Sequence, residues 1–381
     1  MGNFYQFGPP AGTGICWLMQ GLEHAVSMEM TSRTGVQISV ALPQSSISNP
    51  EERPLGLYIP HLKRLLRGAG GVVTLTRADD PDIVHFSCRT GPHSRELSMS
   101  MRASNECWYT KQIPYPSERE APVQASMLAK ALARVVDCAH ENSTMDILHC
   151  VRIKRGAAGI DFSALDGHQF QNFRLPDCAL GDILPPQGIL INREMVRSLL
   201  YLLAAPLMRD AASHIALVAG ADSKARRLFL RGELGTVSVP LSGYDAEAWP
   251  KTEEFLEKAT DASATLTFTG PELRAALGHL GRLETIFERE VFFTPDEGGV
   301  LLSVKNAYFT GRIVLPAHVD GTLRRTAFPA RSLYRLVRAC GERDVTLSIN
   351  TANNGPAAVH LQNIPELTSI IMPMRIEEVQ P

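Results

Sequence analysis

The residues best suited to a binding role lie near the C-terminal end of the sequence, where an apolar run leads into Met372-Pro373-Met374-Arg375. Because proline has no N–H to donate, Pro373 does not suit a central strand of a sheet. The flexible thioether side chains on either side of it can adapt to apolar partners. Two interpretations follow from these residues alone. The segment forms one wall of a peptide-binding groove, or it is a closing edge strand whose methionines fill a core.

Motifs for catalysis are incomplete in this chain. The segment from Gly8 to Gly14 is similar to an ATPase phosphate loop, but Ile15 stands where that motif needs lysine. The 11 histidines are scattered without metal-ligand spacing, and no Ser-His-Asp order accompanies a nucleophile elbow. Nothing near Asp161 and Asp166 in the sequence indicates an acid–base pair. We therefore expect no enzymatic activity, no metal and no cofactor.

A strand, a turn and a helix follow one another five times, with turns near residues 57–60, 123–126, 190–193, 268–271 and 327–330. Pro, Ser or Asn at these points suits the first turn of a helix. The predicted helices cover residues 61–67, 127–136, 194–203, 272–283 and 332–340, and alternating runs after them predict antiparallel strands. The pattern predicts an α+β fold that repeats a module of helices packed on antiparallel sheets.

Basic residues are concentrated in or beside these five helices, which carry only Glu194 and Glu272 as acidic residues. Because each helix must bury its apolar stripe, its basic side chains should face outward. Such a surface would suit phosphate backbones without sequence readout. The alternative is an ordinary solvated face, since Arg and Lys are good helix formers. The residues predicted to face DNA are Lys63, Arg64, Arg67, Lys130, Arg134, Arg193, Arg197, Arg274, Arg282, Arg331, Arg335 and Arg338.

Composition sets the broad class. The 381 residues are enough for two or three domains, and the formal net charge of −2 gives no global positive field. The seven cysteines form no C-x-x-C motif and are odd in number, which is typical of reduced thiols in a cytosolic protein. No signal peptide is evident, and the apolar stretch from Met195 to Met208 is too short to span a bilayer. We expect a cytoplasmic protein without a membrane partner.

Three segments match the landmarks of one known family, in its order and at about its spacing. Ala164-Leu165-Asp166-Gly167-His168-Gln169-Phe170 is similar to Ala-Thr-Asp-Gly-His-Arg-Leu, and Ile370 to Ile376 is similar to Val-Val-Met-Pro-Met-Arg-Leu. Ser242-Gly243-Tyr244 with Trp249-Pro250 is similar to Asp-Gly-Arg-Phe-Pro. Over residues 17 to 376 the chain thus resembles the β subunit of bacterial DNA polymerase III, the sliding clamp.

The resemblance implies three similar clamp-type domains at residues 1–117, 118–257 and 258–381, each with helices on antiparallel sheets. It also implies that the first domain is shortened, because residues 1–16 are too few for the strand and helix that the family places there. In the third domain, Val304 to Val319 carries no acid where the family has an acidic stretch that pairs with the next chain's first domain.

The family binds short linear motifs of DNA polymerases and clamp-loader subunits in a groove between its second and third domains. The positions of this sequence that match the groove are Leu148, Leu165, Gly167, His168, Gln169, Phe170, Pro250, Phe255, Met372, Pro373, Met374, Arg375 and Ile376. Gly167 would allow close backbone approach, while His168 and Arg375 would supply polar contacts at the rim.

Two functional hypotheses remain open at this point. The first is a divergent, nucleoid-associated sliding clamp: a head-to-tail homodimer ring that encircles double-stranded DNA without sequence specificity and tethers polymerase or repair proteins. The second is a clamp-derived adaptor that binds partner peptides without stable ring closure. The shortened first domain and the missing acids of the third domain motivate the second hypothesis.

Overall fold

The computed structural model describes residues 15–20, 26–31, 37–42, 55–58, 73–77, 80, 83–89, 96–102, 116, 120–141, 145–176, 178–204, 212–218, 226–232, 235–282, 290–305, 310–338, 342–350 and 355–375. The chain divides into two compact units. Unit 1 comprises Met1–Ala129, Ala179–Leu184 and Glu194–Gly243, and unit 2 comprises Lys130–Cys178, Pro185–Arg193 and Tyr244–Pro381.

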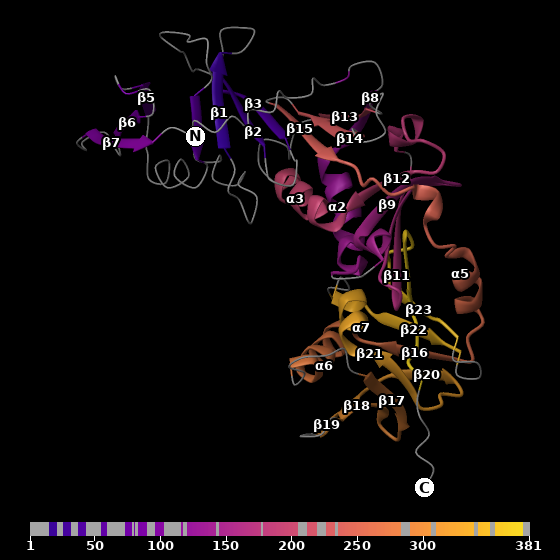
Figure 1. The fold of residues 1–381 in the computed structure, drawn as a ribbon. Helices are drawn as coiled ribbons and strands as arrows, with labels where there is room; N and C mark the ends of the chain where they lie inside the picture. The colour runs from indigo at the N-terminus through magenta and orange to yellow at the C-terminus, as the bar shows by residue number, and fades with distance from the viewer. Residues whose placement is uncertain are drawn as a thin grey trace. The chain divides into compact units, whose positions relative to one another are not determined.

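Four of the five predicted helices are confirmed, and each comes after a short strand with at most one residue between them (Figure 1). They are α2 (Ala125–Val135), α3 (Arg193–Leu203), α6 (Gly270–Arg282) and α7 (Ala330–Val337). The predicted helix at residues 61–67 lies outside the described residues. A further helix, α5 (Glu253–Thr260), was not predicted. Short 3-10 turns occur at η2 (Val136–Cys138), η3 (Asp146–His149), η4 (Ala179–Asp182) and η5 (Ala246–Ala248).

Unit 1 contains two antiparallel sheets. The larger has the strand order β4-β1-β2-β3-β15-β14-β13-β8, and the smaller has the order β5-β6-β7. The larger sheet consists of β1 (Ile15–Gln20), β2 (Val26–Thr31), β3 (Gln37–Leu42), β4 (Leu55–Tyr58), β8 (Glu120–Gln124), β13 (Ala212–Val218), β14 (Arg227–Arg231) and β15 (Gly235–Pro240). The smaller consists of β5 (Val73–Arg77), β6 (Ile83–Arg89) and β7 (Glu96–Arg102).

Unit 2 also contains two antiparallel sheets, with the orders β12-β9-β10-β11-β24-β23-β22-β16-β20 and β19-β18-β17-β21. The first consists of β9 (Cys150–Gly156), β10 (Gly159–Leu165), β11 (Gln169–Leu175), β12 (Ile189–Asn192), β16 (Ala264–Phe268), β20 (His318–Gly321), β22 (Val345–Ile349), β23 (Ala357–Leu361) and β24 (Leu367–Ile371). The second consists of β17 (Glu290–Asp296), β18 (Gly299–Lys305), β19 (Thr310–Leu315) and β21 (Thr326–Pro329).

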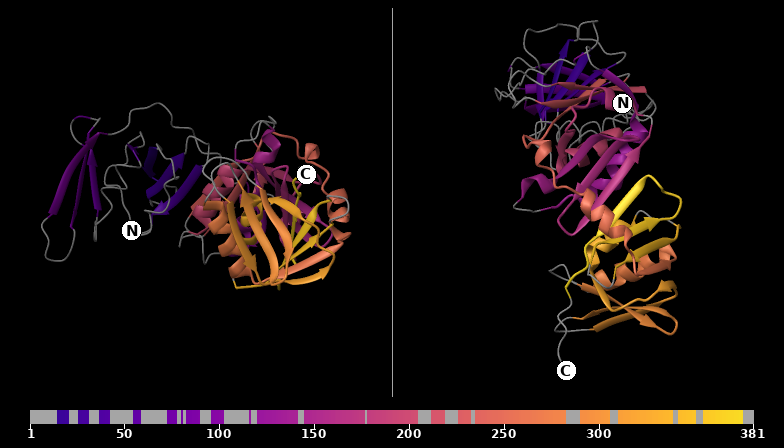
Figure 2. Two further views of the ribbon diagram at one scale, coloured as in Figure 1. Left: turned by 90° about the horizontal axis from the view of Figure 1, so that it is seen from below. Right: turned by 90° about the vertical axis from the view of Figure 1, so that its right-hand side faces the viewer.

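Pairing between distant parts of the sequence makes the long sheets continuous. Strand β3 pairs with β15 in unit 1, and β11 pairs with β24 in unit 2. The magenta strands near residue 170 and the yellow strands near residue 370 therefore lie in one sheet (Figure 2). With helices beside antiparallel sheets, the predicted α+β fold class is confirmed.

Two hairpins of unit 2 repeat the same backbone geometry. Gly159 begins β10 with a φ of 133°, and Gly299 begins β18 with a φ of 140°. A Cβ atom at either glycine would collide with the carbonyl oxygen of Leu175 or Leu315, respectively. Each of these leucines ends the third strand of its meander. This correspondence supports the prediction that one helix-and-sheet module recurs along the chain.

The core beside the second sheet of unit 2 is aromatic. Phe268, Phe293 and Phe328 are almost fully buried and pack edge to face. The ring centroids are 6.2 Å apart for Phe268 and Phe293, and 5.6 Å apart for Phe293 and Phe328. These rings lie on β16, β17 and β21, two of which lead into α6 and α7. Helix α6 packs against α7 (Figure 1). The aromatic core thus lies immediately before the start of α7.

Candidate partner-docking surface and basic cluster

The turn between β10 and β11 is held by Asp166. Its Oδ1 atom accepts hydrogen bonds from the backbone N–H groups of His168 and Gln169, each at 2.9 Å. Its Oδ2 atom accepts a hydrogen bond of 2.7 Å from Gln169 Nε2. Gly167 has a φ of 93°, a conformation that side-chain-bearing residues rarely adopt. The turn therefore presents Gly167 and His168 to solvent while Asp166 and Gln169 are buried.

The predicted C-terminal segment runs alongside this turn. The backbone N–H of Met372 donates a hydrogen bond of 2.7 Å to the carbonyl oxygen of His168. Two residues later, the N–H of Met374 donates one of 2.8 Å to the carbonyl oxygen of Ala327. Pro373 lies between these two donors, so its missing N–H costs neither of these hydrogen bonds. Met372, Pro373 and Met374 are each half-buried, and Arg375 is exposed.

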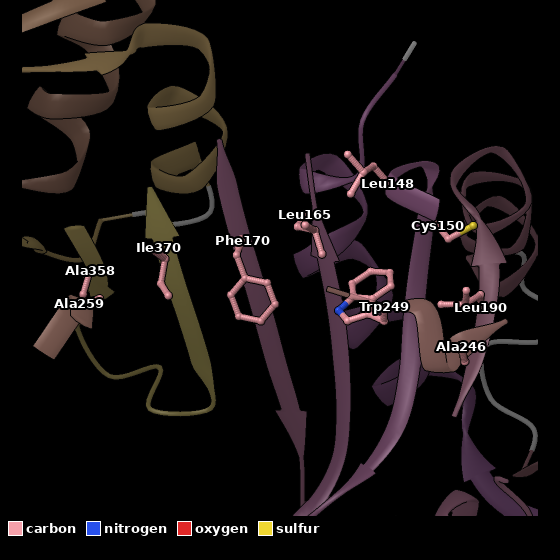
Figure 3. Close-up of a cluster of buried hydrophobic side chains, with 10 residues drawn as sticks. All are labelled: Leu148, Cys150, Leu165, Phe170, Leu190, Ala246, Trp249, Ala259, Ala358 and Ile370. Carbon is pink, nitrogen blue, oxygen red and sulfur yellow. The ribbon is translucent and has the colours of Figure 1, made fainter. Parts of the chain in front are cut away.

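A cluster of buried apolar side chains lies beside the turn (Figure 3). It contains Leu148, Cys150, Leu165, Phe170, Leu190, Ala246, Trp249, Ala259, Ala358 and Ile370, and is called the apolar cluster below. Phe170 lies between Leu165 and Ile370, its partners on the two neighbouring strands. Three of the predicted groove residues, Leu148, Leu165 and Phe170, thus come together here. They are 8%, 8% and 9% exposed, so only their margins meet solvent.

Helix α5 covers part of the apolar cluster through Leu256 and Ala259. Phe255, the predicted groove residue on this helix, is instead 44% exposed. Adjacent positions on a helix point about 100° apart, so Phe255 is exposed to solvent while Leu256 packs on the cluster. Pro250 is half-buried and directly follows Trp249 of the cluster. Ile376 lies outside the described residues.

Arg152 adds a cation to the apolar cluster. Its guanidinium lies over the Trp249 ring, 5.8 Å from the centroid, and its Nη2 donates a hydrogen bond of 3.2 Å to the carbonyl oxygen of Gln187. Burial lowers the pKa of Arg152, while the nearby charge of Glu253 on α5 acts in the opposite direction. A planar cation stacked on an indole is a typical partner for amide or carboxylate groups of a peptide.

On the opposite face of β11, the two residues nearest the turn are polar. Because side chains alternate along a strand, Gln169 and Gln171 face away from Phe170. Gln171 Nε2 donates a hydrogen bond of 3.2 Å to Ser369 Oγ, and Gln171 Oε1 accepts one of 3.1 Å from Cys138 Sγ. Burial raises the pKa of the Cys138 thiol, and Asp166 and Asp137 add to the effect. Gln169 therefore supports the turn from behind and makes no surface for a partner.

Basic residues of α7 gather around two acidic residues. This α7 ion-pair cluster consists of Asp137, Glu141, Arg193, Arg331, Arg335 and Arg338. Glu141 accepts hydrogen bonds from the Nη2 atoms of Arg193 at 2.9 Å, Arg335 at 3.0 Å and Arg331 at 3.1 Å. Arg338 pairs with Asp137. The positions 331, 335 and 338 share one face of α7, as the predicted basic stripe requires.

The charges of this cluster shift its pKa values. Burial by itself would raise the pKa of Glu141, but the hydrogen bond from Arg193 and the charges of Arg193, Arg335 and Arg331 outweigh it and lower that pKa. Burial lowers the pKa of Arg134 on α2, and the like charge of Arg343 lowers it further. With four arginines and two carboxylates, the cluster carries a net positive charge.

The predicted DNA-facing residues have different environments. Arg193 is 3% exposed and its Nε also donates to the carbonyl oxygen of Val136 at 3.3 Å, so it holds the fold together and is left out of the proposed DNA contact. Lys130 is exposed, with its Nζ 5.7 Å from the centroid of the Phe173 ring. Arg274 is half-buried, and Arg197 of unit 1 is exposed and pairs with Glu194. The remaining predicted residues are not described: Lys63, Arg64, Arg67 and the side chain of Arg282.

The described residues contain neither a metal-ligand group nor a membrane-spanning helix. No group of three or more His, Cys, Asp or Glu side chains in this part of the chain could hold a metal ion. Within the same residues, no helix is long and apolar enough to cross a membrane.

Solved structures resemble this chain along almost its whole length. The β subunit of DNA polymerase III from Thermotoga maritima superposes with a TM-score of 0.79 at 12% identity, over 98% of this chain and 96% of that chain. The sliding clamp from Pseudomonas aeruginosa bound to griselimycin superposes with a TM-score of 0.76 at 14% identity, over 96% and 91%. The β subunit from Streptococcus pyogenes gives 0.77 at 13% identity, over 96% and 92%.

The chain has the sliding-clamp fold. The resemblance noted in the sequence is confirmed at the level of fold. No family model and no curated protein matches the sequence. The sliding-clamp fold is thus kept at sequence identities of 12–14%.

Three residues of these surfaces stand outside the predicted groove and DNA-facing sets. Trp249 belongs to the apolar cluster. The sequence marked it only as part of a family landmark, although its rarity was a further signal, because the chain has only three tryptophans. Arg152 lies in an alternating strand and carried no signal beyond its charge. Arg343 follows α7 and is exposed beside Arg134, although the sequence places it outside the predicted helix.

Proposed function

We propose that the protein is a non-enzymatic DNA sliding clamp, which encircles duplex DNA and tethers DNA polymerase or repair proteins to it. The observation that carries the proposal is the sliding-clamp fold over 96–98% of the chain. Topological linkage would supply processivity, so the protein needs no base-specific contacts and no strong affinity for DNA. The proposal includes three modules at residues 1–117, 118–257 and 258–381.

The proposed docking surface for partner peptides is the margin of the apolar cluster. Leu148, Leu165 and Phe170 supply its floor, and the partly exposed Met372, Pro373 and Met374 supply one wall. Gly167, His168, Pro250, Phe255 and Arg375 form its rim, with Arg152 over Trp249 as a further polar contact. Apolar floors with polar rims are typical of sites that hold one or two anchor side chains. Peptides of polymerases and clamp-loader subunits would use such anchors.

The proposed DNA contact uses the exposed basic side chains of the helices. In unit 2 these are Lys130, Arg331 and Arg338, with Arg134, Arg274 and Arg335 less exposed. Arg197, Lys63, Arg64, Arg67 and Arg282 stay in the set through the sequence resemblance. Contacts of this kind neutralise phosphates one by one, so affinity should fall steeply with salt.

The proposed ring is a head-to-tail homodimer. Within the described residues, β7 ends the small sheet of unit 1 and β19 ends the small sheet of unit 2. An edge strand offers unpaired N–H and C=O groups to a strand of another chain. Met99 on β7 is 45% exposed and Val314 on β19 is 47% exposed, so each edge also offers an apolar contact.

A second candidate, the adaptor without stable ring closure, is favoured by one observation. Strand β19, Thr310–Leu315, carries no acidic residue, so this edge lacks the charge that would attract a basic partner strand. Light scattering in solution separates the candidates. A mass of twice the 41.7 kDa chain at micromolar concentration supports the ring, and a monomer supports the adaptor.

Retention on DNA tests the encircling mechanism. After loading onto nicked circular DNA, the protein should stay with the circle and leave once a restriction enzyme linearises it. Equal retention on circular and linear DNA would contradict encirclement. Binding of a labelled peptide with adjacent Leu and Phe anchors tests the docking surface separately, since it needs no DNA.

A further inference from the structure

Glu141 stands out because three arginines converge on one carboxylate. Arg193 and Arg335 donate to its Oε1 atom at 2.9 and 3.0 Å, and Arg331 donates to Oε2 at 3.1 Å. One negative charge balances at most one of these three guanidinium groups. A single ion pair would have sufficed to fix a loop to a helix. The excess of positive charge indicates a place that favours a second anion.

The surroundings reinforce that excess. Arg338 is held beside Arg331 and Arg335 on the same helix face and pairs with Asp137. Arg134, three positions before Asp137, has its pKa lowered in part by the charge of Arg343. The α7 ion-pair cluster therefore holds four arginines against two carboxylates, which leaves it with a net positive charge.

A carboxylate and a phosphate offer guanidinium groups the same kind of acceptor, a pair of oxygens in one plane. We propose that the arginines around Glu141 form a phosphate-binding subsite for the DNA backbone, with Glu141 as an internal competitor for it. The inference rests on the proposed function, because it names the anion as a DNA phosphate. In the absence of DNA, Glu141 pairs with the guanidinium groups. This competition lowers their affinity for DNA phosphates, which suits a protein that must slide along DNA.

The arginines differ in how readily they can change partner. The side chain of Arg193 is 4% exposed and that of Arg335 is 13% exposed, whereas that of Arg331 is 56% exposed. Arg193 also donates to the carbonyl oxygen of Val136, so it stays with Glu141. Arg331 is therefore the group that passes from Glu141 to phosphate.

Fluorescence anisotropy of a short labelled duplex, titrated with the full-length chain at several chloride concentrations, tests the inference. Glu141→Gln should bind DNA about twofold to fivefold more tightly, since the loss of exposed ion pairs has effects of this order. The slope of log affinity against log salt concentration should be steeper by ~0.9, the value for one additional phosphate contact. Glu254→Gln on α5 changes net charge equally at an exposed glutamate outside the cluster, and should leave affinity nearly unchanged.

Two further variants keep the test decisive if Glu141→Gln folds poorly. Glu141→Asp keeps the charge but shortens the reach, so a gain in affinity there arises from released arginine and not from net charge. Arg331→Gln should remove most of the gain when combined with Glu141→Asp, and should have a smaller effect in the wild type.

The outcomes separate this inference from the proposed function. If the wild type binds DNA and Glu141→Gln gains no more than Glu254→Gln, Glu141 serves only to hold the fold and the inference is overturned alone. If none of these proteins binds DNA even at low salt, the DNA contact itself fails and the subsite fails with it. A gain confined to the Glu141 variants and dependent on Arg331 supports the subsite.

Discussion

One face of strand β11 contributes Phe170 to the apolar cluster, whereas the other contributes Gln169 and Gln171 to a buried set of hydrogen bonds. The apolar face meets solvent at its margin, beside the half-buried Met372 and Met374. The face with Gln169 and Gln171 lies on the side of Cys138. Burial raises the pKa of this thiol, and the charges of Arg335 and Arg193 in the α7 ion-pair cluster act in the opposite direction.

The difference between the faces follows from the alternation of one strand. Successive side chains point to opposite sides of a sheet. The three residues Gln169, Phe170 and Gln171 can therefore contribute to two surfaces of unlike chemistry. The same alternation in β24 places Ile370 with Phe170 and Ser369 with Gln171. One pair of strands thus supports both the proposed docking surface and the proposed DNA contact, and substitutions can address each face separately.

Truncation on the apolar face should have the largest effect on stability. Phe170→Ala removes a side chain that is 9% exposed from the apolar cluster, and should lower the free energy of unfolding by about 3 kcal/mol. Phe170→Leu, which fills more of the space, should lose less than half of that. Denaturant titration followed by circular dichroism measures both. Equal losses for the two variants would show that the space around Phe170 does not matter.

Truncation on the polar face should cost less. Gln171→Ala leaves the buried Ser369 hydroxyl and Cys138 thiol without the hydrogen bonds that Gln171 makes, at a cost of about 1–2 kcal/mol. Gln171→Glu at neutral pH should cost at least as much, because it buries a charge near Asp166. The same titration measures these losses. A Gln171→Ala loss that exceeds that of Phe170→Ala would reverse the proposed ranking of the faces.

The sequence was a good guide where the signals are local. Pro and Asn at strand ends predicted the starts of α3 and α7, and Asp166-Gly167-His168 lies in the turn that its residue types favour. Helix α5 was missed, although Thr252 followed by Glu253 and Glu254 is a usual start signal. Without this helix, the exposure of Phe255 could not be predicted.

Charge pairing over long distances could not be predicted. The basic stripe of α7 was found, but its partner Glu141 lies 190 residues from Arg331 in the sequence. The burial of Arg193 likewise depends on contacts with Val136 and Glu141, which lie 57 and 52 residues away. A helix pattern shows which face is basic, but only the fold shows which acidic residues meet that face.

The ion-pair cluster beyond the polar face should contribute a pH-dependent stability. The lowered pKa of Glu141 means that its contribution is present above its ordinary value of 4.5 and is lost as pH falls through the folded-state pKa. Since the Glu141 side chain is 35% exposed, solvent screens the pairs and Glu141→Gln should cost on the order of 1 kcal/mol at neutral pH. The difference from wild type should vanish in acid. A constant difference across the pH range would mean that the charge of Glu141 is not its source.

The smallest effect on stability should come from the rim of the docking surface, where stability and binding separate. Phe255 is 44% exposed on α5, so Phe255→Ala should change the free energy of unfolding by no more than about 0.5 kcal/mol. An aromatic side chain that packs on a peptide anchor contributes more to binding, and affinity for the Leu-Phe peptide should fall about tenfold. Tyr244→Ala removes another exposed aromatic residue of unit 2, 45% exposed and outside the predicted groove, and is the matched control. If both variants weakened the peptide equally, the peptide would be binding to exposed aromatic surface in general, and the docking surface would have to be sought elsewhere.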